Sequence, residues 1–324
     1  MQIVLNRPYA INELGRHENQ EDSVFPEVGA ATPETSFFLV CDGVGGHSKG
    51  EVASRAVCDA FASAIQNTGL PYFGKPCFEE ALKRAYARLD AEHSHGDLPK
   101  MGTTLTFACF HRGGAFVAHI GDSRIYQFRR RGGRVDVLYK SGDHSQVSEL
   151  VRAGAITQEE AASHPRRNVL TRVMQPQEES PASADVFEIT DMAAGDYFFL
   201  CTDGVLESLG DGQLCEILGR EVGDGQKMAA ILAACKQGSR DNFSAYLIPV
   251  AHVTSGMGEK LINMLRRSGH PCPSKPRPGN PMFARRAARA WKRFRRSKAF
   301  FPIVAAVIGL VVTTLAWAIM KNSG

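Results

Sequence analysis

Phe37-Phe38-Leu39-Val40-Cys41-Asp42-Gly43 is the stretch that decides the fold of this chain, because a second stretch repeats its pattern. Tyr197-Phe198-Phe199-Leu200-Cys201-Thr202 likewise leads into Asp203-Gly204. Apolar runs of this length predict strands that are buried on both faces. Asp-Gly most often marks a turn, but glycine also lets the backbone come close to a ligand. Two carboxylates at strand ends, with further acids nearby, are typical of a site for hard divalent cations.

Other segments add polar side chains of the same kind. Between Gly15 and Ser23, the adjacent acids Glu21 and Asp22 follow Arg16. The planar guanidinium of an arginine suits phosphate oxygens. A solvated polar loop explains this segment equally well. The remaining candidates are Asp122, at the end of a predicted strand, and Asp241, shortly before another strand.

The regular elements indicate an α+β protein. We expect strands at 104–110, 115–120, 125–128 and 244–250, with a hairpin turn at 111–114. Helices are expected at 50–67, 77–93, 144–154, 213–219 and 226–237. Runs of strands with helices set apart favour two packed sheets flanked by helices.

At this point the chain resembles a known family, the metal-dependent protein phosphatases of the PPM class, type 2C-like, in their bacterial form. Each motif is weak alone, but their number and order make chance agreement improbable. The resemblance covers roughly residues 10 to 250. The motifs are Arg16 with Glu21-Asp22, Asp42-Gly43-Val44-Gly45-Gly46-His47, Met101-Gly102-Thr103-Thr104, Gly121-Asp122-Ser123-Arg124, Asp143-His144-Ser145, Thr202-Asp203-Gly204 and Asp241-Asn242.

The resemblance implies a four-layer α-β-β-α sandwich of two antiparallel sheets. It also implies hydrolysis of phosphoserine and phosphothreonine in proteins by a metal-activated water, with two Mn²⁺ or Mg²⁺ ions and a third, more labile ion in bacterial members. Independently, a site made of Asp and Glu without clustered Cys or His suits Mg²⁺ or Mn²⁺ better than Zn²⁺. The segment 145–172 matches the mobile flap that shapes entry of the protein substrate, although its role could equally be structural.

The same resemblance implies roles for individual residues. Asp42 matches the bridging aspartate, and the carbonyl oxygen of Gly43 matches a further ligand. Asp203 and Asp241 match the other core ligands, and all three aspartates are expected to be essential for catalysis. The other matches are Asp122 for the third ion, Glu21 and Asp22 for the acidic pair at the site, and Arg16 for the catalytic, phosphate-binding arginine.

Two departures from the family pattern matter. Arg16 lies six positions before Asp22, where the family usually has five, so a one-residue insertion or a local bulge must absorb the difference. Arg124 and Arg172 are weaker candidates for the same role. Eukaryotic members often carry histidine two residues after the bridging aspartate, where this chain has Val44. We expect His47 to be a structural hydrogen-bonding residue, which leaves the general acid unidentified.

Composition fits a cytosolic enzyme. The 324 residues allow one large domain with extensions, and the eight cysteines, which form no CxxC pair, are typical of buried, reduced thiols. The 24 basic and 34 acidic residues before position 260 give that part a net charge of −10. This acidic body argues against nucleic acid as a partner, and we expect a monomer.

The C-terminal part predicts a membrane anchor. Residues 299–320 are 22 apolar or uncharged residues, long enough to span a bilayer as a helix. Eight basic residues between 285 and 298 precede the span, and such charge marks its cytoplasmic side. This basic segment is either an interfacial amphipathic helix on anionic lipid or a plain topogenic cluster. No N-terminal signal peptide is visible.

The sequence therefore predicts four parts: a phosphatase domain at 1–253, a Pro/Gly-rich linker at 254–281, a basic juxtamembrane segment at 282–298 and a transmembrane helix at 299–320. We expect a single-pass protein of the cytoplasmic (inner) membrane, with its catalytic domain in the cytoplasm. Its partners would be phosphorylated proteins, the substrates of a serine/threonine kinase, and membrane lipid. The alternatives are a catalytically silent, membrane-tethered regulator that binds phosphoproteins, and a small-molecule phosphatase, against which the flap motif weighs.

Overall fold

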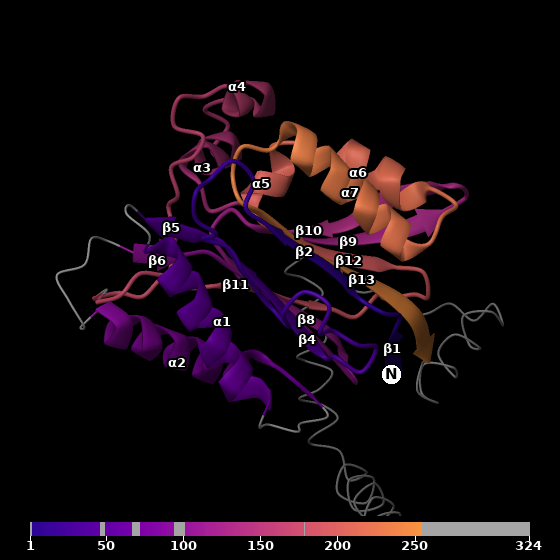
Figure 1. Ribbon diagram of the computed structural model, residues 1–324, viewed down its shortest axis with the longest axis horizontal. Helices are drawn as coiled ribbons and strands as arrows, with labels where there is room; N and C mark the ends of the chain where they lie inside the picture. Colours follow the sequence, from indigo (N-terminus) through magenta and orange to yellow (C-terminus); the bar gives the residue numbers. More distant parts are fainter. Residues whose placement is uncertain (1, 46–48, 67–71, 94–100, 178, 255–324) are drawn as a thin grey trace, which may run out of the picture. The chain divides into compact units, whose positions relative to one another are not determined.

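The computed structural model describes residues 2–45, 49–66, 72–93, 101–177 and 179–254 (Figure 1). The strands are β1 (Gln2–Leu5), β2 (Tyr9–Glu13), β3 (Ser23–Phe25), β4 (Phe37–Cys41), β5 (Gly43–Gly45), β6 (Met101–Thr103), β7 (Leu105–His111), β8 (Gly114–Ile120), β9 (Arg124–Arg131), β10 (Arg134–Lys140), β11 (Asp185–Ile189), β12 (Tyr197–Cys201) and β13 (Phe243–Thr254). The helices are α1 (Gly50–Gln66), α2 (Lys75–His93), α3 (Gln146–Arg152), α4 (Gln158–Ala162), α5 (Asp203–Leu206), α6 (Asp211–Gly219) and α7 (Asp224–Gly238).

The strands form two antiparallel sheets. One has the order β1-β13-β12-β9-β10, and β2 also pairs with β13. This is possible because β13 is 12 residues long, so that its first half pairs with β2 and its second half with β1. The other sheet has the order β11-β8-β7-β4-β3, and β5 pairs with β6 in a small ribbon.

Three hydrophobic clusters hold four layers together. One cluster lies between the two sheets and contains side chains of β4, β8, β12 and β13. A second joins the β4-containing sheet to α1 and α2, and a third joins the β12-containing sheet to α6 and α7. Figure 1 shows these helix pairs on opposite sides of the strands. The expected α-β-β-α arrangement of two antiparallel sheets is therefore present.

The alternation of side chains between the two faces of a strand explains why β4 and β12 are apolar throughout. In β4, Phe37, Leu39 and Cys41 face α1 and α2, whereas Phe38 and Val40 face the other sheet. In β12, Phe199 and Cys201 face α6 and α7, whereas Phe198 and Leu200 face the sheet interface. Side chains of successive strand residues point to opposite faces, so a strand covered on both faces needs apolar residues at every position.

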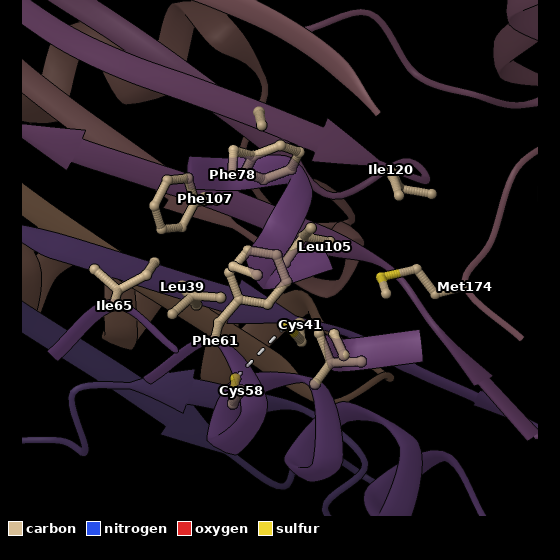
Figure 2. Packing of buried hydrophobic residues seen from close by; sticks show 14 of the residues in the cluster. Leu39, Cys41, Cys58, Phe61, Ile65, Phe78, Leu105, Phe107, Ile120 and Met174 are labelled. Carbon is tan, nitrogen blue, oxygen red and sulfur yellow. Dashed lines mark hydrogen bonds between the residues drawn. The ribbon is translucent and has the colours of Figure 1, made fainter. Parts of the chain in front are cut away.

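An aromatic group fills the cluster beneath the β4-containing sheet. The ring of Phe107 on β7 lies 5.6 Å from that of Phe61 on α1 and 5.7 Å from that of Phe78 on α2. Figure 2 shows these rings meeting beside Leu39 of β4. The packing fixes β4 against α1, and with it the position of the residue that follows Cys41.

The five expected helices and the expected strands lie close to where the sequence predicts them, with small differences at the ends. The sequence analysis named no strand at the positions of β1, β2, β3, β5, β6, β10 and β11. The expected helix at 144–154 spans only Gln146–Arg152, because Ser145 is its N-cap and its Oγ accepts a hydrogen bond from Ser148 N at 3.3 Å. The short helices α4 and α5 were not predicted. The Asp203-Gly204 pair opens α5 instead of forming a simple turn.

The predicted anchor lies outside the described residues, as do the basic segment and all of the linker except Thr254, where β13 ends. The same is true of His47. Within the part of the chain that the structure describes, no helix is long and apolar enough to cross a membrane.

Candidate functional site

The two deciding strands bring their carboxylates to one place. Asp42 directly follows β4, and Asp203 is the first residue of α5, directly after β12 and Thr202. Burial raises the pKa of Asp42 well above its usual range, and the neighbouring carboxylates Asp22, Asp203, Asp122 and Asp241 raise it further, in that order. The structure thus gathers four of the other predicted acids around Asp42.

The other acids repel one another in the same way. Burial raises the pKa of Asp203 to about 6, with Asp241 as the next cause. For Asp122, burial followed by Asp203 and Asp143 raises the pKa to about 7, although Arg124 opposes this. Like charges at close range disfavour ionisation. A divalent cation would remove this repulsion.

Asp22 is the most deeply buried member, with 4% of its surface exposed. Burial raises its pKa to about 8, although a hydrogen bond from Thr202 Oγ1 to Asp22 Oδ2 (3.0 Å) lowers it. Thr202 lies between the second apolar run and Asp203. One threonine therefore links the loop acid Asp22 to the end of β12.

Gly43 and Gly50 allow the backbone after β4 to lie close to the segment that contains Glu21. The amide of Gly43 donates to the backbone oxygen of Glu21 (3.1 Å). A Cβ at Gly43 would lie 2.3 Å from the carbonyl carbon of Gly50 and 2.4 Å from Glu21 O. At Gly50, a Cβ would lie 2.5 Å from Glu21 Oε2. Side chains at either position would push the Glu21 segment away from the backbone of Gly43.

Two threonines form hydrogen bonds with the backbone of Asp42. Thr104 Oγ1 accepts from Asp42 N (3.0 Å), and Thr104 N donates to Asp42 O (2.8 Å). Thr103 Oγ1 also donates to Asp42 O, at 2.9 Å. The hydroxyls of Thr104 and Ser123 lie 2.7 Å apart, which connects this group to the residue after Asp122. The Met101-Gly102-Thr103-Thr104 motif is therefore a support for the acid cluster.

Asn242 fastens the N-terminal acidic loop to the start of β13. Its Oδ1 accepts from Glu21 N at 2.7 Å, and its Nδ2 donates to Leu14 O (2.7 Å) and Asn19 O (3.0 Å). Its own amide donates to Asp241 Oδ1 (2.8 Å). The spacing irregularity near Arg16 falls within this loop.

Two residues near Asp241 had no assigned role in the sequence interpretation. His17 Nε2 lies 3.2 Å from Asp241 Oδ1. Glu207 Oε2 accepts from the amides of Arg240 (2.8 Å) and Asp241 (3.3 Å). Glu207 stands four residues after Asp203 on a helical segment, and this spacing, which puts two side chains on one helix face, is the signal that could have identified it.

The three candidate arginines have different surroundings. Arg16 is exposed, and its amide donates to Arg240 O (3.0 Å), next to Asp241. The guanidinium of Arg124 instead holds Asp143 through Nε (2.7 Å) and Nη2 (2.6 Å) and also donates to Tyr126 Oη (3.1 Å). Arg172 donates to Asp185 Oδ1 (2.7 Å). Arg16 is thus the candidate without an ion pair that occupies its side chain among the described residues.

A cleft of about 670 Å³ lies between the acid cluster and the flap, which we define as residues 145–172. Asp122, Asp203 and Asp241 line it on one side, and Val147 and Asn168 of the flap line it on the other. The acids are therefore open to a molecule that enters beside the flap.

The donor set fits a hard divalent cation. Asp203 Oδ1 is buried and has no hydrogen-bond partner in the described part of the chain. A buried polar atom of this kind is costly unless something binds it. All the candidate ligands are oxygen atoms, which suits Mg²⁺ or Mn²⁺.

Comparison with known proteins gives matches over most of the chain. The family model described as "Protein phosphatase 2C" matches residues 14–237. The serine/threonine phosphatase stp of Listeria innocua is 30% identical over 240 residues, which cover 72% of this chain and 90% of that protein.

Solved structures are similar as well. The serine/threonine phosphatase PstP/Ppp of Mycobacterium tuberculosis superposes with a TM-score of 0.65 at 30% identity, covering 77% of this chain and 100% of the other. A structure of the catalytic domain of PstP in complex with two manganese ions gives a TM-score of 0.62 at 28% identity, with the same coverage.

Proposed function

Since this chain belongs to the protein phosphatase 2C family and is a serine/threonine protein phosphatase, we propose that it hydrolyses phosphoserine and phosphothreonine in proteins with Mn²⁺ or Mg²⁺ as its cofactor. The observation that carries this proposal is the gathering of Asp22, Asp42, Asp122 and Asp203, whose burial and mutual repulsion raise their pKa values. Such a cluster is unfavourable by itself and becomes favourable around cations.

The core ligands follow from position in the fold. Asp42 would bind two ions at the end of β4, with the Gly43 carbonyl oxygen as an additional ligand. Asp203 and Asp241 would complete the core site, and the unpartnered Oδ1 of Asp203 has a free lone pair for this purpose. When bound, the ions would offset the charge of the phosphate and lower the pKa of the attacking water.

The remaining acids would act around this core. Asp122 would hold a third ion together with Asp203, consistent with the effect of Asp203 on its pKa. Glu21 and Asp22 would contact the site directly or through water. Thr104, Asn242 and Glu207 would position the ligands through the hydrogen bonds described above.

Arg16 would bind the phosphate of the substrate. It is exposed beside Asp241 and belongs to the loop that Asn242 holds in place. A guanidinium makes two parallel hydrogen bonds to phosphate oxygens, which fixes the orientation of the group. The phosphorylated residue would approach through the cleft beside the flap.

We further propose that residues 299–320 anchor the protein in the cytoplasmic membrane, with the acidic body in the cytoplasm. The length of the uncharged run and the eight preceding basic residues support this topology. The prolines of 254–281 would keep the linker extended. Membrane-bound phosphoproteins would then be within reach.

The activity is tested with purified full-length protein and a phosphothreonine peptide. Phosphate release should require Mn²⁺ or Mg²⁺, stop with a chelator and return with Mn²⁺. Asp122→Ala should still bind about two ions but turn over slowly. A catalytically silent regulator would instead bind the phosphopeptide without releasing phosphate, with or without Mn²⁺.

The anchor is tested by fractionation. The full-length protein should stay with membranes in high salt, because apolar burial holds a spanning helix and salt screens only the basic segment. Protein truncated after about Gly256 should be soluble, with unchanged turnover on a free peptide. Release of the full-length protein by salt, or digestion of the catalytic domain from outside intact spheroplasts, would contradict the proposed topology.

A further inference from the structure

The two ends of the flap meet at its base. Gln146 N donates to Val169 O (2.8 Å), and Thr171 N donates to His144 O (2.8 Å). Ser145 and Leu170 form an antiparallel bridge between the same two segments. The flap is thus a closed loop, with His144 just before it and Arg172 as its last residue.

The carboxylate of Asp185 contacts residues at both ends of the flap. Asp185, the first residue of β11, lies with Oδ2 3.2 Å from His144 Nε2 and with Oδ1 2.7 Å from Arg172 Nη1. Since β11 pairs with β8 at the edge of the β4-containing sheet, this carboxylate is attached to the sheet and not to the flap. Asp185 therefore fastens the base of the flap to the sheet.

His144 also forms two hydrogen bonds with the turn that precedes Asp122. Its amide donates to Gly121 O (2.9 Å), and its Nδ1 accepts from Gly121 N (3.1 Å). Gly121 has a φ of +104°, and a Cβ there would lie 2.5 Å from Thr104 Cγ2. The turn before Asp122 therefore has a backbone conformation that requires glycine at position 121. His144 forms hydrogen bonds with both the N–H and the C=O of Gly121.

The hydrogen bonds define the tautomer of His144. A backbone N–H can only donate, so Nδ1 must offer its lone pair to Gly121, and the ring hydrogen must be on Nε2. Nε2–H then donates to Asp185. The ring of His119, stacked 4.5 Å away, is similarly fixed because its Nε2 donates to Gly142 O (2.8 Å).

This tautomer argues against a metal ion at the same place. The nearest ligand atoms of His119, His144 and Asp185 lie within 4.8 Å of one another, which is close enough to suggest one. However, neutral His144 has no lone pair left for a metal, and the Arg172 guanidinium already provides positive charge at Asp185. The group is better explained as a hydrogen-bonded clasp.

We propose that His144, Asp185 and Arg172 form a clasp that couples the flap to the Asp122 turn, so that His144 and Asp185 are positioning residues for Asp122. Asp185 fixes the tautomer of His144, and His144 fixes the amide of Gly121. The effect on metal binding rests on the proposed function, in which Asp122 is a ligand. The coupling itself rests only on the contacts above.

Three substitutions separate the parts of the clasp. His144→Phe keeps a ring to stack on His119 but loses both side-chain hydrogen bonds. His144→Asn puts an oxygen near the place of Nδ1, so the bond from Gly121 N can form while the link to Asp185 is lost. His111→Phe is the control, because His111 also pairs with a β11 carboxylate, Glu188 (3.4 Å), and its ring packs against Tyr72, which lies outside the flap.

The test uses full-length protein and two measurements. Hydrogen–deuterium exchange of peptides covering 119–125 and 144–172 should accelerate at least tenfold in His144→Phe. In His144→Asn, exchange at 119–125 should return toward wild type. Mn²⁺ titration should show the weakest site weakened about 10- to 100-fold in His144→Phe, as for other residues that orient metal ligands, while the two tighter sites stay unchanged. His111→Phe should match wild type in both measurements.

Unchanged exchange at 119–125 in folded His144→Phe would overturn the clasp. Equal acceleration in His144→Asn and His144→Phe would also overturn it, because the bond to Gly121 would then not matter. If the wild-type protein binds no Mn²⁺, the proposed function fails, whereas the exchange data still decide whether the clasp exists.

Discussion

Strand β12 has a carboxylate just beyond each end, and the two are held in opposite ways. Before it, Asp196 has no exposed surface and accepts hydrogen bonds from Arg129 Nε (2.7 Å) and Nη2 (2.8 Å), Gln127 Nε2 (3.0 Å) and Ala193 N (2.9 Å). After it, Asp203 has a buried Oδ1 that has no hydrogen-bond partner among the described residues, and its neighbours are also acids. The first carboxylate is satisfied by the protein, whereas for the second we propose a cation as the partner.

The largest effect should come from Asp203→Asn. The amide keeps the shape but loses the charge that we propose binds the ions, and bound ions can supply several kcal/mol of transition-state stabilisation. Turnover of a phosphopeptide should fall roughly 10³-fold or more. In the presence of chelator, the melting temperature should stay equal to that of wild type or rise, because a repelling charge is gone.

Steady-state kinetics at saturating Mn²⁺ and thermal melting with chelator check this prediction. Asp42→Asn should behave in the same way. Near-normal turnover of either purified variant would place the active site elsewhere.

Asp196→Ala should lower the stability of the fold and leave Mn²⁺ binding unchanged, which is the opposite of Asp203→Asn. Removal of the carboxylate leaves Arg129, 14% exposed, without its main partner. Breaking a buried ion pair in this way costs about 3–5 kcal/mol. Urea denaturation should show this loss of unfolding free energy, while the folded fraction at low temperature keeps its Mn²⁺ affinity. A loss of less than about 1 kcal/mol would mean that this network contributes little.

Arg16→Ala should have a smaller effect that is confined to substrate binding. A charge-assisted hydrogen bond is worth about 1.5–3 kcal/mol, so KM should rise roughly 10- to 100-fold with Mn²⁺ binding unchanged. Arg7→Ala, a substitution outside the acidic loop, serves as the control. An unchanged KM would remove Arg16 from this role and make His17, beside Asp241, the next residue to test.

A further effect, on stability alone, is a pH dependence of the metal-free protein. The pKa values of Asp22, Asp122 and Asp203 are raised to about 8, 7 and 6, whereas carboxyls of the unfolded chain titrate near about 4. The folded state then binds more protons between these values, so its stability should fall as pH rises from about 4 to 8. Melting temperatures with chelator at pH 5.5 and 8 measure this, and a rise would contradict it.

The strands that hold the site could be predicted from the sequence because their signal is local. Apolar runs that end in Asp-Gly predicted β4 and β12, and both are buried on both faces. The acids at their ends, together with Asp22 and Asp122, are brought together as the motifs suggested, although their roles as ligands stay predictions.

What the sequence could not show depends on contacts between distant segments. Arg124 was a candidate for phosphate binding, but its pairing with Asp143 depends on the turn between them. The role of Asn242 in holding the Glu21 loop joins residues 221 positions apart. No periodicity or local motif reports such pairs, because the sheet order that creates them is a property of the whole fold.

The central claim is that carboxylates the protein leaves unpaired form its cation site. Calorimetric titration of Mn²⁺ into chelator-stripped, full-length protein tests it most directly, with wild type, Asp203→Asn and Asp196→Asn compared at one pH. We expect at least two bound ions for wild type and for folded Asp196→Asn, and weakened binding with fewer ions for Asp203→Asn. Equal binding by wild type and Asp203→Asn, or no binding by wild type, would contradict it.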